Sequence, residues 1–231
     1  MLFILTGEIQ TGKTRWLQQL IAKLEERGVV PYGVIAPGTW IDHGEQLAEG
    51  RFEKMGIQNE LLPNQERIPF ARRADLAQAE GALDNASQAM RAKLFWAIDD
   101  SAIARVNAHL GEISEAGSKE TPANSEVPLT LEAPSTPESS AKTDSLEGLE
   151  TPGLLVIDEL GRLELLANEG LTAAVELLDR GPTTLYAHAL IIVREQLLPV
   201  ALVRFAHAPW SGIQPISPGP EAENLIFAAY E

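Results

Sequence analysis

The stretch that decides the fold is residues 1–28, MLFILTGEIQTGKTRWLQQLIAKLEERG. Its residues 2–5 form a short apolar run, which predicts a buried strand. Further along, apolar residues recur at helical spacing on one face, namely Trp16, Leu17, Leu20, Ile21 and Leu24. Gly28 follows them where a helix of this length is expected to end. The segment therefore predicts a strand, a glycine-containing loop and an amphipathic helix, in that order.

The loop between these two elements matches the pattern G-x-x-x-x-G-K-S/T at every position. It reads Gly7-Glu8-Ile9-Gln10-Thr11-Gly12-Lys13-Thr14. The two glycines allow close backbone approaches that a Cβ would obstruct, so the loop amides and the positive end of the helix can bind phosphate. Lys13 is expected to reach the β- and γ-phosphates, and Thr14 to offer its hydroxyl to Mg²⁺. We therefore predict a P-loop whose eight residues bind a nucleoside triphosphate, with Mg²⁺ as the cofactor.

A second motif lies far along the chain, where residues 154–157 form a continuous apolar run followed by Asp158 and Glu159. Such a run is typical of a strand that is buried on both faces. Because open α/β sheets bind ligands at the carboxyl ends of their strands, we expect Asp158 to hold Mg²⁺ opposite Thr14. Glu159 is then the candidate to orient or deprotonate the attacking water, and Lys13 is the other catalytic candidate. Without the P-loop, the same two residues would be read as a capping or solvated acidic pair.

Additional positive charge is usual at such a site, because charge spreads over the γ-oxygens in the transition state of phosphoryl transfer. Arg162, just beyond the acidic pair, and Arg194, directly after a predicted strand, are the candidates for a transition-state arginine. Arg72 and Arg73 are weaker candidates. For any one of the four, an ordinary surface charge is the stronger explanation.

Two aromatic residues, Trp40 and Phe70, could stack on a nucleobase, although core packing is the stronger explanation for each. The preferred base is therefore left open. The four histidines are His43, His109, His188 and His207. None of them has the spacing of a metal-ligand set.

The rest of the chain alternates strand-like and helical segments. Strands are expected within residues 29–36, 95–98, 154–157, 185–193 and 211–216, and helices within 99–110, 171–178 and 195–205. Residues 76–93 are interpreted as either helical or a loop. The alternation predicts an α/β fold with a mainly parallel, doubly wound sheet. We interpret residues 1–231 as a single domain.

Two segments interrupt this alternation. From about residue 41 to 73, short apolar pieces separated by turn residues predict a small antiparallel β-insertion. From about residue 115 to 152, the chain is rich in Ser, Thr, Pro and Glu and has no aromatic residue. This composition predicts a disordered acidic loop. The loop could bind a protein partner, although its composition favours a merely solvated insert.

Composition and charge exclude several classes of protein. The 231-residue chain has a formal net charge of -15 and a pI of about 4.7, so binding to nucleic acid or to an anionic membrane is not expected. The absence of cysteine excludes disulfides, thiolate metal sites and cysteine nucleophiles, and is compatible with the cytoplasm. No apolar stretch reaches the length of a membrane span, and the N-terminal apolar run is too short for a signal peptide.

The two motifs together resemble the thermostable-type nucleoside-triphosphatase family. Its members pair an N-terminal P-loop with a strand that ends in Asp-Glu-apolar-Gly-basic-x-Glu-apolar. Here that motif is Asp158-Glu159-Leu160-Gly161-Arg162-Leu163-Glu164-Leu165, and residues 34–37 and 51–72 are also similar. The resemblance implies a RecA-like P-loop NTPase fold, built as a three-layer sandwich, and slow Mg²⁺-dependent hydrolysis of ATP, GTP and other nucleotides to diphosphates. Glu8-Ile9-Gln10 and Arg15 depart from the usual loop of the family, but neither departure removes a required group.

Two other functions could use the same motifs. In a small-molecule kinase, a substrate hydroxyl would replace water as the acceptor of the γ-phosphate. In a nucleotide-dependent switch or adaptor, turnover would be slow and the acidic loop would bind the partner. Hydrolysis is the main hypothesis, because Glu159 next to the metal ligand suits the activation of water.

Overall fold

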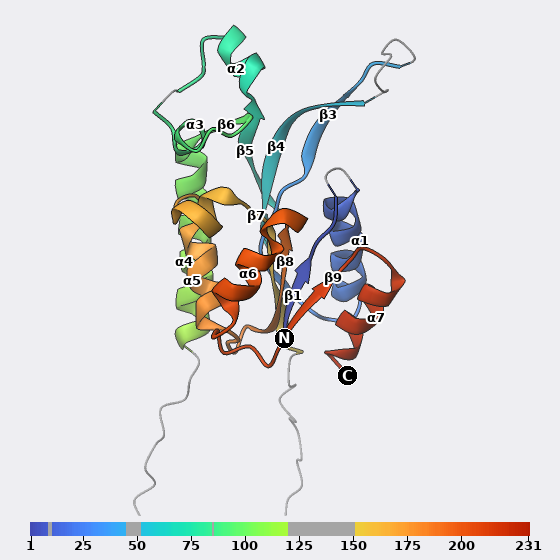
Figure 1. Ribbon diagram of the computed structural model, residues 1–231. Coiled ribbons are helices and arrows are strands. Elements are labelled where there is room, and N and C mark those ends of the chain that lie inside the picture. The colour runs from blue at the N-terminus through green and yellow to red at the C-terminus, as the bar shows by residue number, and fades with distance from the viewer. Residues whose placement is uncertain (9–10, 45–51, 85, 120–150) are drawn as a thin grey trace, which may run out of the picture.

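Nine strands form one mixed sheet in the computed structural model, which describes residues 1–8, 11–44, 52–84, 86–119 and 151–231 (Figure 1). The parallel part has the strand order β2-β7-β8-β1-β9. These strands are β1 (Leu2–Leu5), β2 (Pro31–Ile35), β7 (Gly153–Leu160), β8 (Tyr186–Val193) and β9 (Ile213–Ile216). The predicted α/β fold with a mainly parallel core is confirmed.

The antiparallel part of the sheet continues from β2, at the top of Figure 1. It consists of β3 (Gly38–Asp42), β4 (Phe52–Leu62), β5 (Glu66–Arg73) and β6 (Trp96–Ile98). Strand β4 pairs with β2, β3 and β5, and β6 pairs with β5, all of them antiparallel. The small antiparallel insertion predicted at about 41–73 is therefore present. It begins earlier than predicted, at Gly38. It also includes β6, which lies beyond the predicted boundary but pairs with β5.

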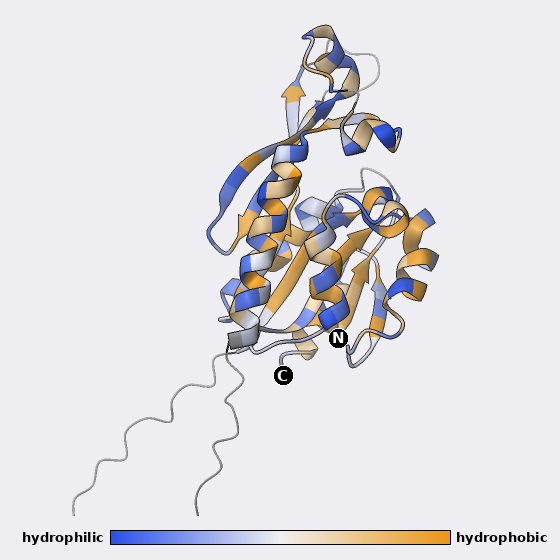
Figure 2. Ribbon diagram, turned by 90° about the vertical axis from the view of Figure 1, so that its left-hand side faces the viewer, coloured by the Kyte–Doolittle hydropathy of each residue, from blue (hydrophilic) through white to orange (hydrophobic). Residues whose placement is uncertain are grey.

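Helices cover both faces of the parallel strands and make a three-layer sandwich (Figure 1). One face carries α1 (Lys13–Glu25) and α7 (Pro220–Ala228). The other face carries α4 (Asp100–Lys119), α5 (Thr172–Arg180) and α6 (Leu198–Phe205). Figure 2 shows the consequence for hydropathy, with apolar strands lying between helices whose outer surfaces are more polar.

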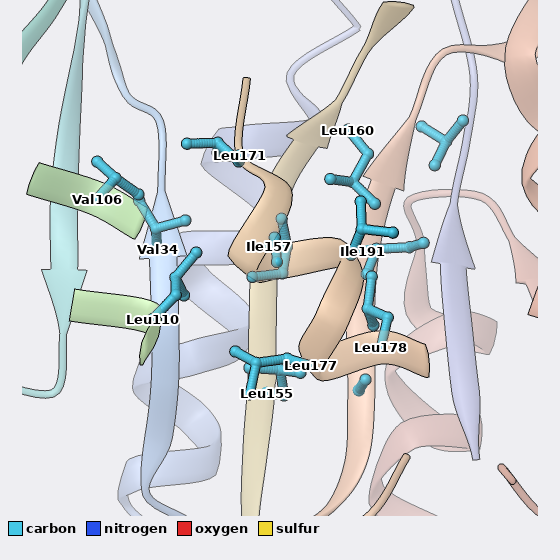
Figure 3. Close-up of a cluster of buried hydrophobic side chains, with 14 of the residues drawn as sticks. Val34, Val106, Leu110, Leu155, Ile157, Leu160, Leu171, Leu177, Leu178 and Ile191 are labelled. Atoms are coloured by element: carbon cyan, nitrogen blue, oxygen red, sulfur yellow. The ribbon is translucent and has the colours of Figure 1, made fainter. Parts of the chain in front are cut away.

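Two apolar clusters fill the two interfaces of this sandwich. Leu154 and Val156 of β7 pack in the cluster under α1, whereas Leu155 and Ile157 pack in the cluster under α4 and α5 (Figure 3). Successive side chains of a strand point to opposite faces, so a strand between two helical layers must be apolar at every position. This is why the run at 154–157 predicts a buried strand, and why β7 is fixed firmly at the centre of the sheet.

Several short elements connect the layers. Residues 76–93, whose structure was left open between a helix and a loop, contain most of α2 (Ala74–Ala79) and α3 (Gln88–Arg91). A π-helical turn (Leu163–Ala167) follows β7, and a 3₁₀ turn (Glu195–Leu197) precedes α6. Neither the π-helical turn nor α7 was predicted. Pro199 lies in the first turn of α6, where its missing N–H leaves no helical hydrogen bond unmade.

The acidic loop predicted at about 115–152 lies mostly outside the described residues, because 120–150 are not among them. At its start, α4 extends as far as Lys119 and therefore enters the predicted loop. At its end, β7 begins at Gly153. No helix in the described part of the chain is long and apolar enough to cross a membrane.

Candidate functional site

The predicted phosphate loop connects the carboxyl end of β1 to the first residue of α1. Gly7 has a φ of 146° and Gly12 a φ of 83°, both in the region that favours glycine. Gly12 is the N-cap of α1, so the helix begins directly at Lys13. The Thr11 hydroxyl donates a hydrogen bond to the Glu8 carbonyl at 3.0 Å. Ile9 and Gln10, also predicted to bind the nucleotide, lie outside the described residues.

The Lys13 ammonium folds back over this loop. Its Nζ donates to the Gly7 carbonyl at 3.0 Å and to the Glu8 carbonyl at 2.5 Å. The side chain is thereby held on the concave side of the loop, next to the N-terminus of α1. A positive charge at a helix N-terminus adds to the favourable potential that the helix dipole offers to an anion. Phosphate binding is the chemistry that this arrangement supports.

Asp158, at the end of β7, meets Thr14 at the start of α1. Its Oδ1 accepts a hydrogen bond from the Thr14 hydroxyl at 3.4 Å, and its Oδ2 accepts one from the Ala36 N–H at 2.9 Å. The carboxyl is only 4% exposed, and burial raises its pKa to about 6, although both hydrogen bonds act in the opposite direction. The structure thus brings together the hydroxyl and the carboxylate that were predicted to share a metal ion.

These two groups fit Mg²⁺, which prefers oxygen ligands and is usually bound by one or two carboxylates plus substrate phosphates. A buried carboxylate whose ionised form is disfavoured gains most from a nearby cation. Among the described residues, no group of three or more His, Cys, Asp or Glu side chains could hold a metal ion. The pair of Thr14 and Asp158 fits a metal whose other ligands include phosphate oxygens.

Glu159 reaches the same site because β7 contains a β-bulge. Ile157 pairs with Ile191 and Leu160 pairs with Val193, so two residues of β7 stand opposite one residue of β8. Glu159 itself has a φ of 73°, which is unusual for a residue with a side chain. In a regular strand Asp158 and Glu159 would point to opposite faces. Here both line one cavity, and no local sequence pattern predicted the bulge.

Of the two predicted arginines, Arg194 contacts the acidic pair. It follows the last residue of β8, and its Nε donates to the Glu159 carboxylate at 2.5 Å. Arg162 lines the same cavity as Glu159 but forms no ion pair with the described residues. Strand β8 lies between β1 and β7 in the sheet, so Arg194 emerges between the phosphate loop and the acidic pair.

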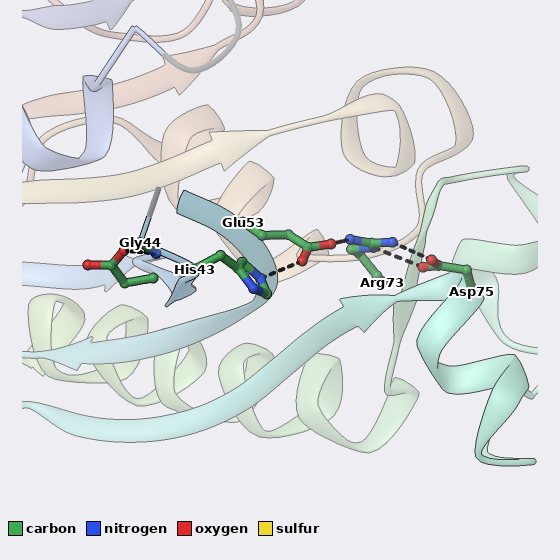
Figure 4. A network of polar contacts seen from close by, with 6 residues as sticks. His43, Gly44, Glu53, Arg73 and Asp75 are labelled. Carbon is green, nitrogen blue, oxygen red and sulfur yellow. Dashed lines mark hydrogen bonds and ion pairs between the residues drawn. The ribbon is translucent and has the colours of Figure 1, made fainter. Parts of the chain in front are cut away.

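The weaker candidates Arg72 and Arg73 are engaged elsewhere. Arg72 forms a two-pronged pair with Glu80, at 2.5 and 2.7 Å. Arg73 bonds to both Glu53 and Asp75, and Glu53 also meets Nε2 of His43 at 2.9 Å (Figure 4). These contacts join the antiparallel strands to α2. They place Arg73 and His43 in a polar network of the sheet extension, which is the antiparallel part of the sheet formed by β3, β4, β5 and β6.

Glu164 fixes the turn that follows the acidic pair. One carboxylate oxygen accepts the N–H of Gly161 at 2.8 Å, and the other accepts the N–H of Leu171 at 2.9 Å. The side chain is 8% exposed, and burial raises its pKa. The resemblance included this glutamate without a role. The structure shows that its two hydrogen bonds connect the start of the π-helical turn to the start of α5, which keeps Arg162 beside the cavity.

Lys54 of β4 is a residue of the site that the sequence patterns did not predict. Its ammonium lies 5.3 Å from the centre of the Trp96 ring and 6.0 Å from that of Trp40, distances typical of cation–π contacts. Burial lowers its pKa, while the charges of Glu159 and Asp158 raise it. The side chain therefore faces the acidic pair from the sheet extension. No local pattern marks it, because only the pairing of β4 with β2 places it there.

A cavity of about 260 Å³ adjoins the acidic pair on the side of the sheet extension. Its polar lining includes Asp158, Glu159, Arg162 and Arg194. Phe70, one of the two aromatic residues considered for stacking, also lines it, whereas Trp40 does not. No residue of the phosphate loop is part of the lining among those that the structure describes.

The chain has a P-loop NTPase-like fold. Two solved structures have a similar fold: THEP1 from the hyperthermophile Aquifex aeolicus and a human cancer-related nucleoside triphosphatase. The first is 14% identical with a TM-score of 0.53, over 100% of this chain and 99% of that one. The second is 17% identical with a TM-score of 0.53, over 99% and 93%. The sequence matches no protein-family profile and no curated protein. At these identities, the likeness concerns the fold alone.

Proposed function

We propose that the chain is a Mg²⁺-dependent nucleoside-triphosphatase that hydrolyses ATP, GTP and other nucleoside triphosphates to diphosphates and phosphate. The observation that supports this best is the meeting of Thr14 and Asp158 at 3.4 Å, across 144 residues of sequence. It joins the end of a phosphate loop to a carboxylate from another strand. One structural neighbour is described as a nucleoside triphosphatase, which agrees with the proposal.

In the proposed complex, the loop amides and Lys13 bind the phosphates. Thr14 and Asp158 would hold the metal ion, which would supply positive charge to stabilise the phosphates. The contacts of Lys13 with the Gly7 and Glu8 carbonyls are exchanged for phosphate oxygens. The Ala36 N–H donates to the second oxygen of Asp158 and so fixes the orientation of this carboxylate, which would be one ligand of the metal.

Glu159 then orients the attacking water and accepts its proton. Arg194 holds this carboxylate through Nε, which leaves its other N–H donors for the γ-phosphate. Lys54, whose charge interacts with both carboxylates of the acidic pair, supplies a second positive charge. Charges in these places would be most useful when negative charge moves onto the leaving and equatorial oxygens.

Phosphate release is the test of this proposal. We expect wild type to release phosphate from ATP, GTP, CTP and UTP only with Mg²⁺, and Lys13→Ala and Glu159→Gln to lose about 100-fold or more in rate. Lys23→Ala is the matched control, because Lys23 is on the same helix and pairs at the surface with Glu223 at 2.6 Å. Equal rates for wild type and Lys13→Ala would refute the proposal.

A small-molecule kinase is the second candidate, and the cavity next to Glu159 favours it. A hydroxyl bound there would bond to the γ-phosphorus while the β–γ bridging bond breaks, with its proton passing to Glu159. Labelled phosphate would then appear on the acceptor, with little release in its absence. We do not expect nucleic-acid binding, given the charge of -15.

Four further proposals concern the whole protein. Residues 1–231 form one domain, because the nine described strands belong to one sheet. The protein functions in the cytoplasm, where a chain without cysteine is at no disadvantage. A protein partner, if one exists, binds the acidic residues between α4 and β7. In that case the chain could also work as a switch with slow turnover.

A further inference from the structure

The cavity beyond the acidic pair has properties that hydrolysis does not use. Its walls are mainly apolar and come from the sheet extension and α4, with Ile57, Phe70, Trp96, Ile98 and Ile103 among them. Water activation needs no such walls. Binding pockets for small organic molecules, in contrast, combine apolar walls with a few polar groups that fix orientation.

Among the polar groups that line the cavity, Asn59 of β4 is the strongest indication of a bound ligand. It is 2% exposed and lines the cavity, yet its side-chain amide makes no hydrogen bond with the described residues. Because the amide lines the cavity and has no partner among the described residues, a ligand or water in the cavity can pair with it. The amide offers one donor edge and one acceptor edge side by side. A matching ligand presents an acceptor and a donor on one edge.

A planar ring is the shape that suits the rest of the cavity. Phe95 lines it and is 90% exposed, so one face of a phenyl ring is available at its solvent side. Trp96 and Phe70 add aromatic surface to the walls. Aromatic side chains bind flat heterocycles by stacking. Arg162 also lines the cavity without an ion pair to the described residues, and can pair with an anionic substituent.

We propose that this cavity binds the nucleobase of a second molecule, a nucleoside or its 5′-monophosphate. The base stacks on the aromatic wall and pairs with the Asn59 amide, as asparagine does with base edges elsewhere. That the molecule lies beyond the γ-phosphate rests on the proposed function. Asp158 meets Thr14 on one side and lines the cavity on the other, so the acidic pair separates the two ligands.

Isothermal titration of the full chain tests the binding. The probes are adenosine, guanosine, cytidine and uridine and their 5′-monophosphates, each with and without saturating Mg²⁺ and ADP. We expect one-to-one binding of at least one probe, unchanged by ADP, and weakened at least tenfold in Asn59→Leu. A monophosphate that binds more tightly than its nucleoside, and that loses this advantage in Arg162→Gln, identifies the monophosphate as the ligand.

Thermal unfolding without ligand distinguishes a ligand-binding amide from a structural one. Asn59→Leu removes an amide that lines the cavity and has no partner among the described residues, so its Tm is expected to stay equal or rise. Asn107→Leu is the matched control, because the Asn107 amide donates to the Gly170 carbonyl at 2.9 Å and accepts from the Ala173 N–H at 3.1 Å. Its Tm is expected to fall. A similar fall for Asn59→Leu would overturn the proposal.

Three binding results would also overturn it. They are no saturable binding of any probe, equal binding to Asn59→Leu, and competition by ADP, which would mean that the cavity holds the base of the loop-bound nucleotide. Lys13→Ala separates this proposal from the proposed function. Nucleoside binding is expected to survive in that variant while phosphate release is lost. If wild type released no phosphate, the proposed hydrolase function would be refuted. The titrations would still show whether the cavity binds a nucleoside or its monophosphate.

Discussion

At the scale of single residues, Asp158 occupies the most constrained position in the site. Both of its oxygens have partners, Thr14 on one side and Ala36 on the other. Because burial raises its pKa to about 6, the ionised carboxylate depends on nearby positive charge. The metal proposed above would supply part of that charge. Lys54 is the side chain from the sheet extension whose field acts in the same direction.

The role of Lys54 can be measured. We expect Lys54→Met to lower kcat for phosphate release about 10- to 100-fold, or about 1.4 to 2.7 kcal/mol, with little change in KM. The reason is that charge develops in the transition state and not in the ground state. Lys54→Arg is expected to recover part of the loss, and Lys23→Met should behave as wild type. Unchanged kcat in Lys54→Met would show that the lysine only packs against Trp40 and Trp96.

At the scale of elements, the bulge in β7 decides where Glu159 points. Its φ of 73° is a conformation that costs a non-glycine residue free energy, and such strain is found mostly at functional sites. We expect Glu159→Gly to raise the free energy of unfolding by about 1 kcal/mol while abolishing phosphate release. Glu159→Gln should abolish release without the gain in stability. Urea denaturation of both variants is the measurement, and a less stable Glu159→Gly would argue against strain.

The turn after β7 depends on a close approach at Gly170. This glycine has a φ of 74°, and a Cβ there would lie 2.1 Å from Oε1 of Glu164, which is itself held by two backbone N–H groups. We expect Gly170→Ala to lower the free energy of unfolding by about 3 kcal/mol. Gly81→Ala is the control, because Gly81 has a φ of 70° but open space around its Cβ position.

The free energy of unfolding of Gly81→Ala should fall by only about 1 kcal/mol, because only its backbone conformation is unfavourable. The difference between the two variants measures the clash with Glu164. If chemical denaturation showed the same loss of unfolding free energy in both variants, the turn would have adjusted to the added Cβ. The two hydrogen bonds of Glu164 would then hold the turn less firmly than their geometry suggests.

At the scale of the whole molecule, the residues of the site come from distant parts of the chain, namely the phosphate loop, Ala36, Lys54, the acidic pair and Arg194. None of them lies between α4 and β7. We expect a variant with residues 120–150 replaced by a Gly-Ser linker of about ten residues to fold and to retain phosphate release. Circular dichroism and the release assay check this. A loss of release in a folded variant would instead show that the acidic residues take part in turnover.

The sequence predicts structure best where a local pattern is compatible with only one kind of element. The helix in residues 13–25 and the strands at 2–5 and 154–157 follow from apolar spacing, and the Thr14–Asp158 contact follows from placing two motifs on those elements. Between Arg162 and Arg194 the sequence could not choose, since both follow a strand. Tertiary structure places Arg194 on Glu159 because β8 lies between β1 and β7.

The sequence by itself determined the glycine-containing loop before α1, the α/β layers and the position of the acidic pair at the end of a strand, because glycine torsions and apolar periodicity act over a few neighbouring residues. Only the tertiary structure decided the bulge that turns Glu159, the position of Lys54, and the unpaired amide of Asn59 in its cavity. Each of these depends on the register between strands far apart in the chain. A shift of one residue in that register would send the same side chain to the opposite face.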